Sequence, residues 1–108
     1  MLKSACFWSQ QAIELFLKAF LLEKNVFDIR RHRTHNLIYL VRECYKIDKD
    51  FEEILEVGDL KGISSFAIIT KYDISFLKMV TEQDAREAID VAEKVRNFIL
   101  RKLNIKNL

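Results

Sequence analysis

The sequence predicts an all-α protein that folds as an antiparallel up-and-down helical bundle. Three observations favour this class: the chain has no proline and only two glycines, 50% of its residues are hydrophobic, and apolar residues recur at helical spacing in several stretches. With 108 residues, the chain is expected to form a single domain over residues 1–108, large enough to bury one core without metal or disulfides.

The first helix is expected over residues 3–24, where the polar side chains fall on one narrow stripe. Apolar side chains occupy most of the remaining circumference, and each large one left in water forfeits about 1.5–3 kcal/mol. We therefore expect this helix to be covered, either at the centre of a bundle or in an interface. The polar stripe consists of Lys3, Gln10, Gln11, Glu14 and Lys18, and the apolar residues are Trp8, Ala12, Ile13, Leu15, Phe16, Ala19, Phe20 and Leu22.

Three further helical stretches are expected in the middle of the chain. The first begins at its N-cap Thr34 and reaches Tyr45. Asp50 is expected to cap a short helix that Gly58 ends. Residues 63–72 have some strand propensity, but no partner strand is evident, so this stretch is predicted to be helical. The residues expected to face the core are Leu37, Leu40, Val41 and Cys44 in the first of these helices and Phe51, Ile54 and Leu55 in the second.

The start of the last helix is predicted from Thr81 and Asp84, which resemble a capping box with Asp in place of Glu or Gln. Its small residues permit close approach of a neighbouring helix, and the basic residues near its end suit the C-terminal pole of the helix dipole. The expected apolar stripe is Ala85, Ala88, Ile89, Ala92, Val95 and Ile99, and the basic residues are Arg96, Arg101 and Lys102.

Charge and cysteine usage exclude several classes of protein. A net charge of +2 argues against a strongly cationic nucleic-acid binder, so any basic function must be local. The run from Arg30 to Arg33, with His32, is expected to be an exposed basic loop able to contact phosphate. The isolated Cys6 and Cys44 are expected to be buried and reduced, which favours a cytoplasmic protein. No stretch has the length of a membrane span, and neither a metal site nor a cofactor motif is evident.

The polar stripe of the first helix is the first candidate site. Gln11, Glu14 and Lys18 share one face, and Glu14 to Lys18 is the favourable i, i+4 orientation. They form either a solvated face with a weak ion pair or a polar strip inside a groove. In the second case Lys18 meets phosphate, and Gln11 or Glu14 meets base or ribose.

Arg30 and His35 are the second candidate. His35 can activate a ribose hydroxyl while Arg30 steadies the phosphate, which amounts to RNA cleavage without metal. Alternatively, His35 simply anchors the start of its helix by a hydrogen bond. Lys71 and Tyr72 are the third candidate: Tyr72 stacks on a base while Lys71 holds phosphate, or Tyr72 is half-buried packing.

Several of these motifs together resemble the HEPN domain, a family of prokaryotic and higher-eukaryotic proteins. Residues 11–19 follow its Q-A-x-E-x-x-x-K-A pattern, and residues 34–37 follow T-H-x-L. Lys71-Tyr72-Asp73 stands where the family often has Arg-Tyr-Pro, and Asp84 to Ala92 resembles its last helix. The resemblance covers residues 5–98.

This resemblance implies a helical bundle that is commonly a homodimer and binds nucleotides. Many members accompany a small nucleotidyltransferase in a toxin–antitoxin-like pair, and others are metal-independent ribonucleases with an Arg-x(4–6)-His motif. Three features depart from the family: Arg30 and His35 lie earlier than its ribonuclease motif, Leu37 stands where paired toxins have Tyr, and Lys71 and Asp73 replace Arg and Pro. The family's usual preceding helix is also missing, so a second subunit, or residues upstream of Met1, is expected to cover the first helix.

The leading hypothesis is a HEPN-type homodimer that binds nucleotide or RNA and partners a nucleotidyltransferase. Its groove is expected to be lined by Gln11, Glu14, Lys18, His35 and Tyr72. The alternatives are a ribonuclease toxin that uses Arg30 and His35, and a purely structural interaction domain, which a polar stripe facing bulk water would favour.

Overall fold

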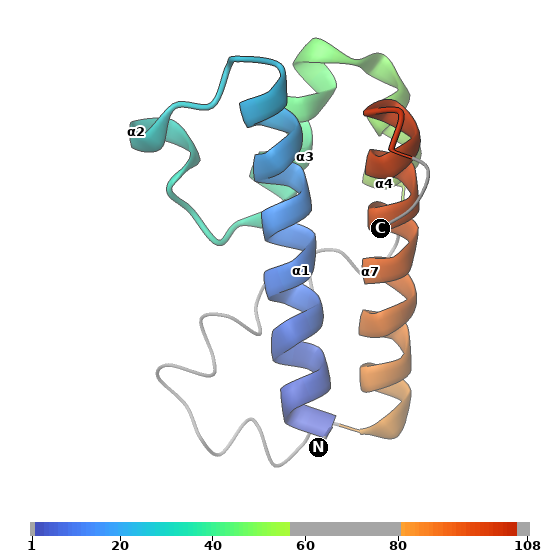
Figure 1. Cartoon of the computed structure of the whole chain (residues 1–108). Coiled ribbons are helices and arrows are strands. Elements are labelled where there is room, and N and C mark those ends of the chain that lie inside the picture. The colour runs from blue at the N-terminus through green and yellow to red at the C-terminus, as the bar shows by residue number, and fades with distance from the viewer. Residues whose placement is uncertain (1, 57–80, 106–108) are drawn as a thin grey trace.

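The computed structural model describes residues 2–56 and 81–105, and all regular structure in these two ranges is helical (Figure 1). The predicted all-α class is confirmed. The predicted helix over residues 63–72 and the stop at Gly58 lie outside the described residues. The helices are α1 (Leu2–Glu23), α2 (Ile29–His32), α3 (Leu37–Ile47), the 3₁₀ helix η1 (Lys49–Phe51), α4 (Glu52–Leu55) and α7 (Glu82–Lys102).

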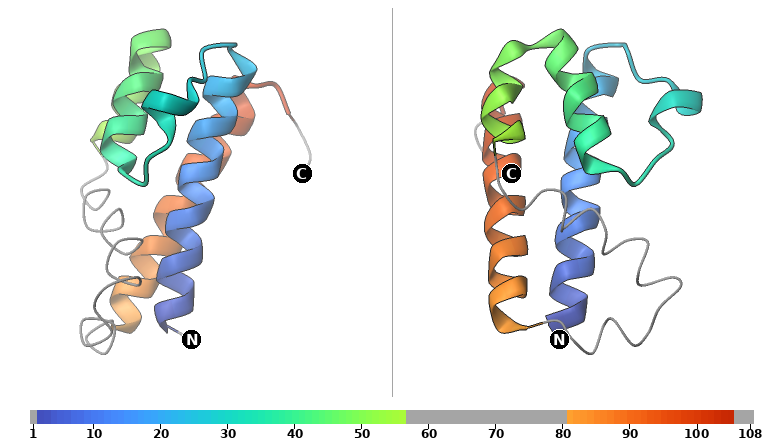
Figure 2. Two further views of the ribbon diagram at one scale, coloured as in Figure 1. Left: turned by 90° about the vertical axis from the view of Figure 1, so that its left-hand side faces the viewer. Right: turned by 180° about the vertical axis from the view of Figure 1, so that it is seen from behind.

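The three longest helices run in the same direction (Figures 1 and 2). Near the start of α7, Asp84 lies close enough to Cys6 on α1 to act on its thiol, and Cys44 Sγ on α3 lies 3.7 Å from the carbonyl of Leu17. The chain returns along α1 through residues 24–36, and this return lets α3 rise beside α1. The structure is therefore a helical bundle, in which the described helices α1, α3 and α7 point the same way.

Three aromatic rings pack together and link η1 to the C-terminal parts of α1 and α7. Phe51 lies between Phe20 and Phe98, with ring centroids 4.7 Å away on both sides in edge-to-face geometry. The core extends from these rings along the facing sides of the helices. It includes Cys6, Ile13, Leu17 and Leu21 of α1, Leu37, Leu40, Val41 and Cys44 of α3, Ile54 of α4, and Ala85, Ala88, Val91, Val95 and Ile99 of α7.

The buried faces of α3 and α4 agree with the prediction, whereas two other faces differ from it. In α7, Ile89 is 41% exposed, and Val91 and Phe98 are buried in its place. In α1, Trp8, Leu15 and Leu22 are exposed by 66%, 63% and 64%. Within residues 2–56 and 81–105, α7 and α3 pack against α1, and the Trp8, Leu15 and Leu22 side of the helix stays exposed. Whether an interface covers this side stays a prediction.

Side-chain caps set the helix starts. The Thr81 capping box is confirmed: Asp84 N donates to Thr81 Oγ1, and Thr81 N donates to Asp84 Oδ2. At α3, however, Asn36 and not Thr34 is the N-cap, because its Oδ1 accepts from Tyr39 N at 3.0 Å.

At η1 the cap also differs from the prediction. Asp48 accepts from the backbone N of Asp50 at 2.9 Å, whereas the Asp50 carboxylate pairs with Lys102 of α7. Asp50 therefore ties η1 to α7 and does not begin a helix.

Both cysteines are free and buried, as expected. Burial, aided by the charge of Glu43, raises the pKa of the Cys44 thiol to about 12. None of the helices in the described part of the chain is long and apolar enough to cross a membrane.

Candidate functional site

The carboxylate of Glu14 joins α1 to the start of α3. Its Oε1 lies 2.7 Å from Nδ1 of His35, and its Oε2 lies 2.9 Å from Nζ of Lys18. An ionised carboxylate only accepts hydrogen bonds, so His35 Nδ1 and Lys18 are both donors here. One buried acidic group therefore holds an imidazole and an ammonium group side by side.

Two glutamines extend this arrangement along α1. Gln10 is fully buried, and its Nε2 donates to Glu14 Oε1 at 3.3 Å and to the backbone carbonyl of His35 at 3.4 Å. Gln11 Nε2 in turn donates to Gln10 Oε1 at 2.7 Å. We call Gln10, Gln11, Glu14, Lys18 and His35 the Glu14 cluster.

The Glu14 cluster is neither wholly buried nor wholly solvated. The Glu14 side chain is 7% exposed, whereas those of Lys18 and His35 are 21% and 44% exposed. Burial acts to raise the pKa of the Glu14 carboxyl, but hydrogen bonds from Lys18, His35 and Gln10, with the charge of Lys18, outweigh it and lower the pKa. The anion is thus held inside while its two cationic or ionisable partners reach the surface.

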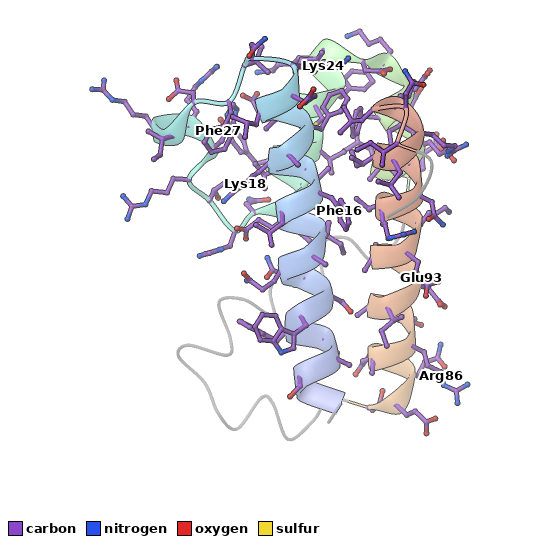
Figure 3. All side chains as sticks on the ribbon, in the orientation of Figure 1. Phe16, Lys18, Lys24, Phe27, Arg86 and Glu93 are labelled. Atoms are coloured by element: carbon purple, nitrogen blue, oxygen red, sulfur yellow. The ribbon has the colours of Figure 1, made fainter. Side chains whose placement is uncertain are left out.

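The structure unites four of the predicted site residues and leaves Arg30 apart from them. Gln11, Glu14, Lys18 and His35 lie in one cluster, and Lys18 projects on the same side of α1 as the connection to α3 (Figure 3). Arg30 is exposed on α2, and no hydrogen bond or ion pair joins it to His35 in the described residues. Lys71 and Tyr72 lie outside the described residues.

His32 and Glu43 form a second buried polar pair, which was not predicted. His32 is 1% exposed, its Nε2 lies 3.0 Å from Glu43 Oε1, and its Nδ1 accepts a hydrogen bond from the backbone N of Asp28 at 2.8 Å. The expectation that His32 is exposed is wrong, because the loop folds its ring inward against Phe27. In the sequence, only the position of Glu43 at the border of the apolar face of α3 hinted at this pair.

Glu43 is also the meeting point of two basic side chains. Lys46 Nζ lies 2.6 Å from its Oε2, and Arg31 Nη1 lies 3.7 Å from its Oε1. The hydrogen bonds from Lys46 and His32 lower the pKa of the Glu43 carboxyl against the opposing effect of burial. Glu43 therefore stays ionised while it fixes α2 to α3.

An open hollow of about 560 Å³ lies elsewhere, between η1, α4 and the end of α7. Carboxylates of η1 and α4 and basic groups of α7, together with Lys49, line it. Because the two signs of charge are mixed there, the hollow gives no clear preference for an anionic ligand.

The comparison with protein families agrees with this architecture. A family model described as "HEPN domain" matches residues 1–103. Searches of curated proteins and of solved structures found no significant match. The matched range includes the whole Glu14 cluster and points to a nucleotide- or RNA-related function. Because the match spans nearly the whole chain, the protein belongs to the HEPN domain family.

Proposed function

We propose that this HEPN domain binds nucleotide or RNA at the Glu14 cluster. The observation that supports this is the shared carboxylate: Glu14 holds Lys18 at 2.9 Å and His35 at 2.7 Å on its two oxygens. An ammonium group positioned in this way is suited to a phosphate, and Gln11 offers an amide to a base or ribose. Lys71 and Tyr72 remain predicted contributors.

Calorimetric titration tests this proposal. ATP, other mononucleotides and short RNA are titrated into the wild-type protein and into Lys18→Ala. A hydrogen bond to a charged group contributes about 1.5–3 kcal/mol, so the variant is expected to bind roughly tenfold or more weakly. Lys94→Ala, which removes an exposed cation of α7, is the matched control. The absence of heat from every ligand would count against the proposal and would favour a purely structural domain.

The protein is further proposed to act as a homodimer through α1. Trp8, Leu15 and Leu22, here called the Leu15 stripe, follow one another at intervals of seven and lie on one exposed side of the helix. Leu15 is midway between the other two. An antiparallel pair of α1 helices about a two-fold axis therefore places Leu15 against Leu15 of the second copy, and Trp8 against its Leu22.

This pairing also has a consequence for the Glu14 cluster. Gln11 and Lys18 lie beside the Leu15 stripe on the helix surface. A two-fold axis perpendicular to α1 places these edges of both copies on the same side of the dimer. The two clusters would then face one shared groove.

The proposed partner of the dimer is a minimal nucleotidyltransferase, in a toxin–antitoxin-like pair. This proposal is supported by membership of the HEPN domain family. Copurification of the tagged protein from its native cell, followed by mass spectrometry, tests it. Recovery without any nucleotidyltransferase would contradict it.

A metal-independent ribonuclease is the second candidate function. The observation in its favour is the contact between His35 Nδ1 and Glu14, because a carboxylate that orients an imidazole is a common arrangement in acid–base catalysis. Cleavage of RNA in the presence of a chelator is compared for the wild type, His35→Ala and Arg30→Ala. Equal activity of His35→Ala and the wild type would end this proposal.

A further inference from the structure

The positive charge of this protein is concentrated in one short stretch. Residues 30–46 contain five of the 18 basic residues and one of the 16 acidic residues, which gives this stretch a charge of +4. The other 13 basic and 15 acidic residues leave the rest of the chain at −2. The small net charge therefore conceals a strongly basic segment.

The structure gathers these five residues on α2, its flanking loop and α3. Arg30, Arg31, Arg33, Arg42 and Lys46 are all exposed, and we call them the basic surface. Arg31 and Lys46 approach the same Glu43 carboxylate from α2 and α3. Arg42 lies one helical turn before Lys46. The basic surface thus spans both helices, and Figure 1 shows α2 on the side of α1 opposite α7.

Buried contacts hold the backbone of the basic surface in place. The buried ring of His32 uses both of its nitrogens. Its Nδ1 accepts a hydrogen bond from Asp28 N, and its Nε2 contacts Glu43. The Asp28 side chain accepts from the backbone N of Arg30 and so caps α2. These buried contacts fix the backbone that carries the arginines, which reduces the ordering that a ligand must impose.

Within the described part of the chain, the nearby carboxylates pair with other cations than Arg30, Arg33 and Arg42. Asp28 is paired with Arg31 at 3.4 Å, and the buried Glu43 is already shared by Lys46, Arg31 and His32. In residues 2–56 and 81–105, no ion pair with a carboxylate is formed by Arg30, Arg33 or Arg42. Four of the five cations are arginines, whose planar guanidinium groups suit phosphate oxygens.

We propose that the basic surface binds the phosphodiester backbone of a polynucleotide. The basic surface and the Glu14 cluster share no residue, but the connection from α2 to α3 contains His35, which belongs to that cluster. A strand with a nucleotide at the Glu14 cluster can therefore continue over α2 and α3. This inference rests on the proposed function and specifies its ligand as a chain of nucleotides.

The test compares two variants that lose the same charge. Arg30→Gln, Arg33→Gln and Arg42→Gln are combined in one protein, and Arg86→Gln, Lys94→Gln and Arg101→Gln of α7 are combined in the control. All six side chains are exposed, and Arg86 lies on the far side of the molecule from Lys18 (Figure 3). Binding of AMP and of single-stranded RNA of about 12 nucleotides is measured over a range of salt concentrations.

The expected result is selective. The basic-surface variant should bind the RNA roughly tenfold or more weakly. Its salt-dependence slope should be lower by about two to three, because binding releases about one counterion fewer for each phosphate contact that is lost. Its affinity for AMP should be unchanged, and the α7 control should resemble the wild type in both assays. Circular dichroism verifies that both variants are folded.

Several outcomes would overturn the inference. An equal loss of RNA binding in the α7 control would show an effect of net charge alone. An unchanged salt slope in the basic-surface variant would show that these arginines do not contact phosphate. Displacement of RNA by polyglutamate as effective as that by unlabelled RNA would indicate a surface for acidic proteins. If AMP binds and RNA gains nothing from its length, only this inference fails; if neither binds, the proposed function fails as well.

Discussion

Glu14 and His35, which are separated by 21 positions in the sequence, meet at 2.7 Å between Oε1 and Nδ1. This contact connects the middle of α1 to the residue before the N-cap of α3. It places a surface-exposed imidazole on a buried carboxylate that also holds Lys18. The stability of the bundle and the arrangement of the candidate site therefore depend on the same group.

Replacing Glu14 by Gln is expected to destabilise the fold. The variant keeps the shape of the side chain but removes the charge that Lys18 and His35 share, and its amide nitrogen faces one of these donors. We expect the free energy of unfolding to fall by about 1–3 kcal/mol. Chemical denaturation measures this change. Glu93→Gln on α7, an exposed residue, is the control and should behave as the wild type does.

The same carboxylate predicts a loss of stability in acid. The pKa of Glu14 is lowered in the folded state, so its contribution is fully present above the unfolded-state value of about 4.3 and is lost as the pH falls through the lower, folded value. Glu43 has a lowered pKa as well and adds to this slope. Denaturation at a series of acidic pH values should show a shallower slope for Glu14→Gln. An identical slope in variant and wild type would contradict the prediction.

Removing the ring of His32 should loosen the basic loop. His32→Ala leaves a cavity, removes the acceptor of the Asp28 backbone N and takes one donor from Glu43, at a cost of about 2–4 kcal/mol. Trypsin should then cleave faster after Arg30, Arg31 or Arg33, and mass spectrometry of early digests identifies the sites. Unchanged cleavage rates would mean that His32 does not anchor this loop.

A charge in the Leu15 stripe should prevent dimer formation. Leu15→Glu places a carboxylate at the proposed two-fold axis, directly opposite the same residue of the second copy. Sedimentation is expected to show a dimer for the wild type and a monomer for this variant. Ile29→Glu is the control, because Ile29 is 67% exposed on α2 and lies off the stripe. A wild-type protein that sediments as a monomer at every concentration would refute the pairing.

The buried thiols should be chemically silent in the native protein. The pKa of Cys44 is raised to about 12 and that of Cys6 is raised by burial, and only the thiolate reacts with alkylating reagents. We expect no modification by iodoacetamide at mildly alkaline pH. Unfolding in guanidinium should expose both residues. Rapid labelling of the folded protein would show that one of these sites opens.

Much of the fold could be predicted from the spacing of residues along the chain. Helical periodicity identified α1, the buried face of α3 and the capping box of α7, because these features arise between residues within one or two helical turns. The same spacing placed Gln11, Glu14 and Lys18 on one side of α1. The direction of the helices could not be predicted, because it depends on how residues 24–36 return along α1.

Contacts between distant segments account for what the sequence did not show. His32 stands among three arginines, a composition that predicts a surface residue, but contacts with Glu43 on the next helix and with the backbone of Asp28 hold it inside. Likewise, Gln10 is a polar residue whose burial depends on the carbonyl of His35 and on Glu14. Burial of a polar group requires a partner, and these partners lie in other segments or across a helical turn.

The sequence by itself determined an all-helical chain of the HEPN family, with a polar stripe on a largely apolar first helix. The tertiary structure decided that His35 completes this stripe, that Arg30 stands apart from it, and that the Leu15 stripe is left in solvent. The physical reason is the separation of the interacting residues along the sequence. Periodicity and capping act within a helix, whereas a buried carboxylate acquires its hydrogen-bond donors only when two segments meet.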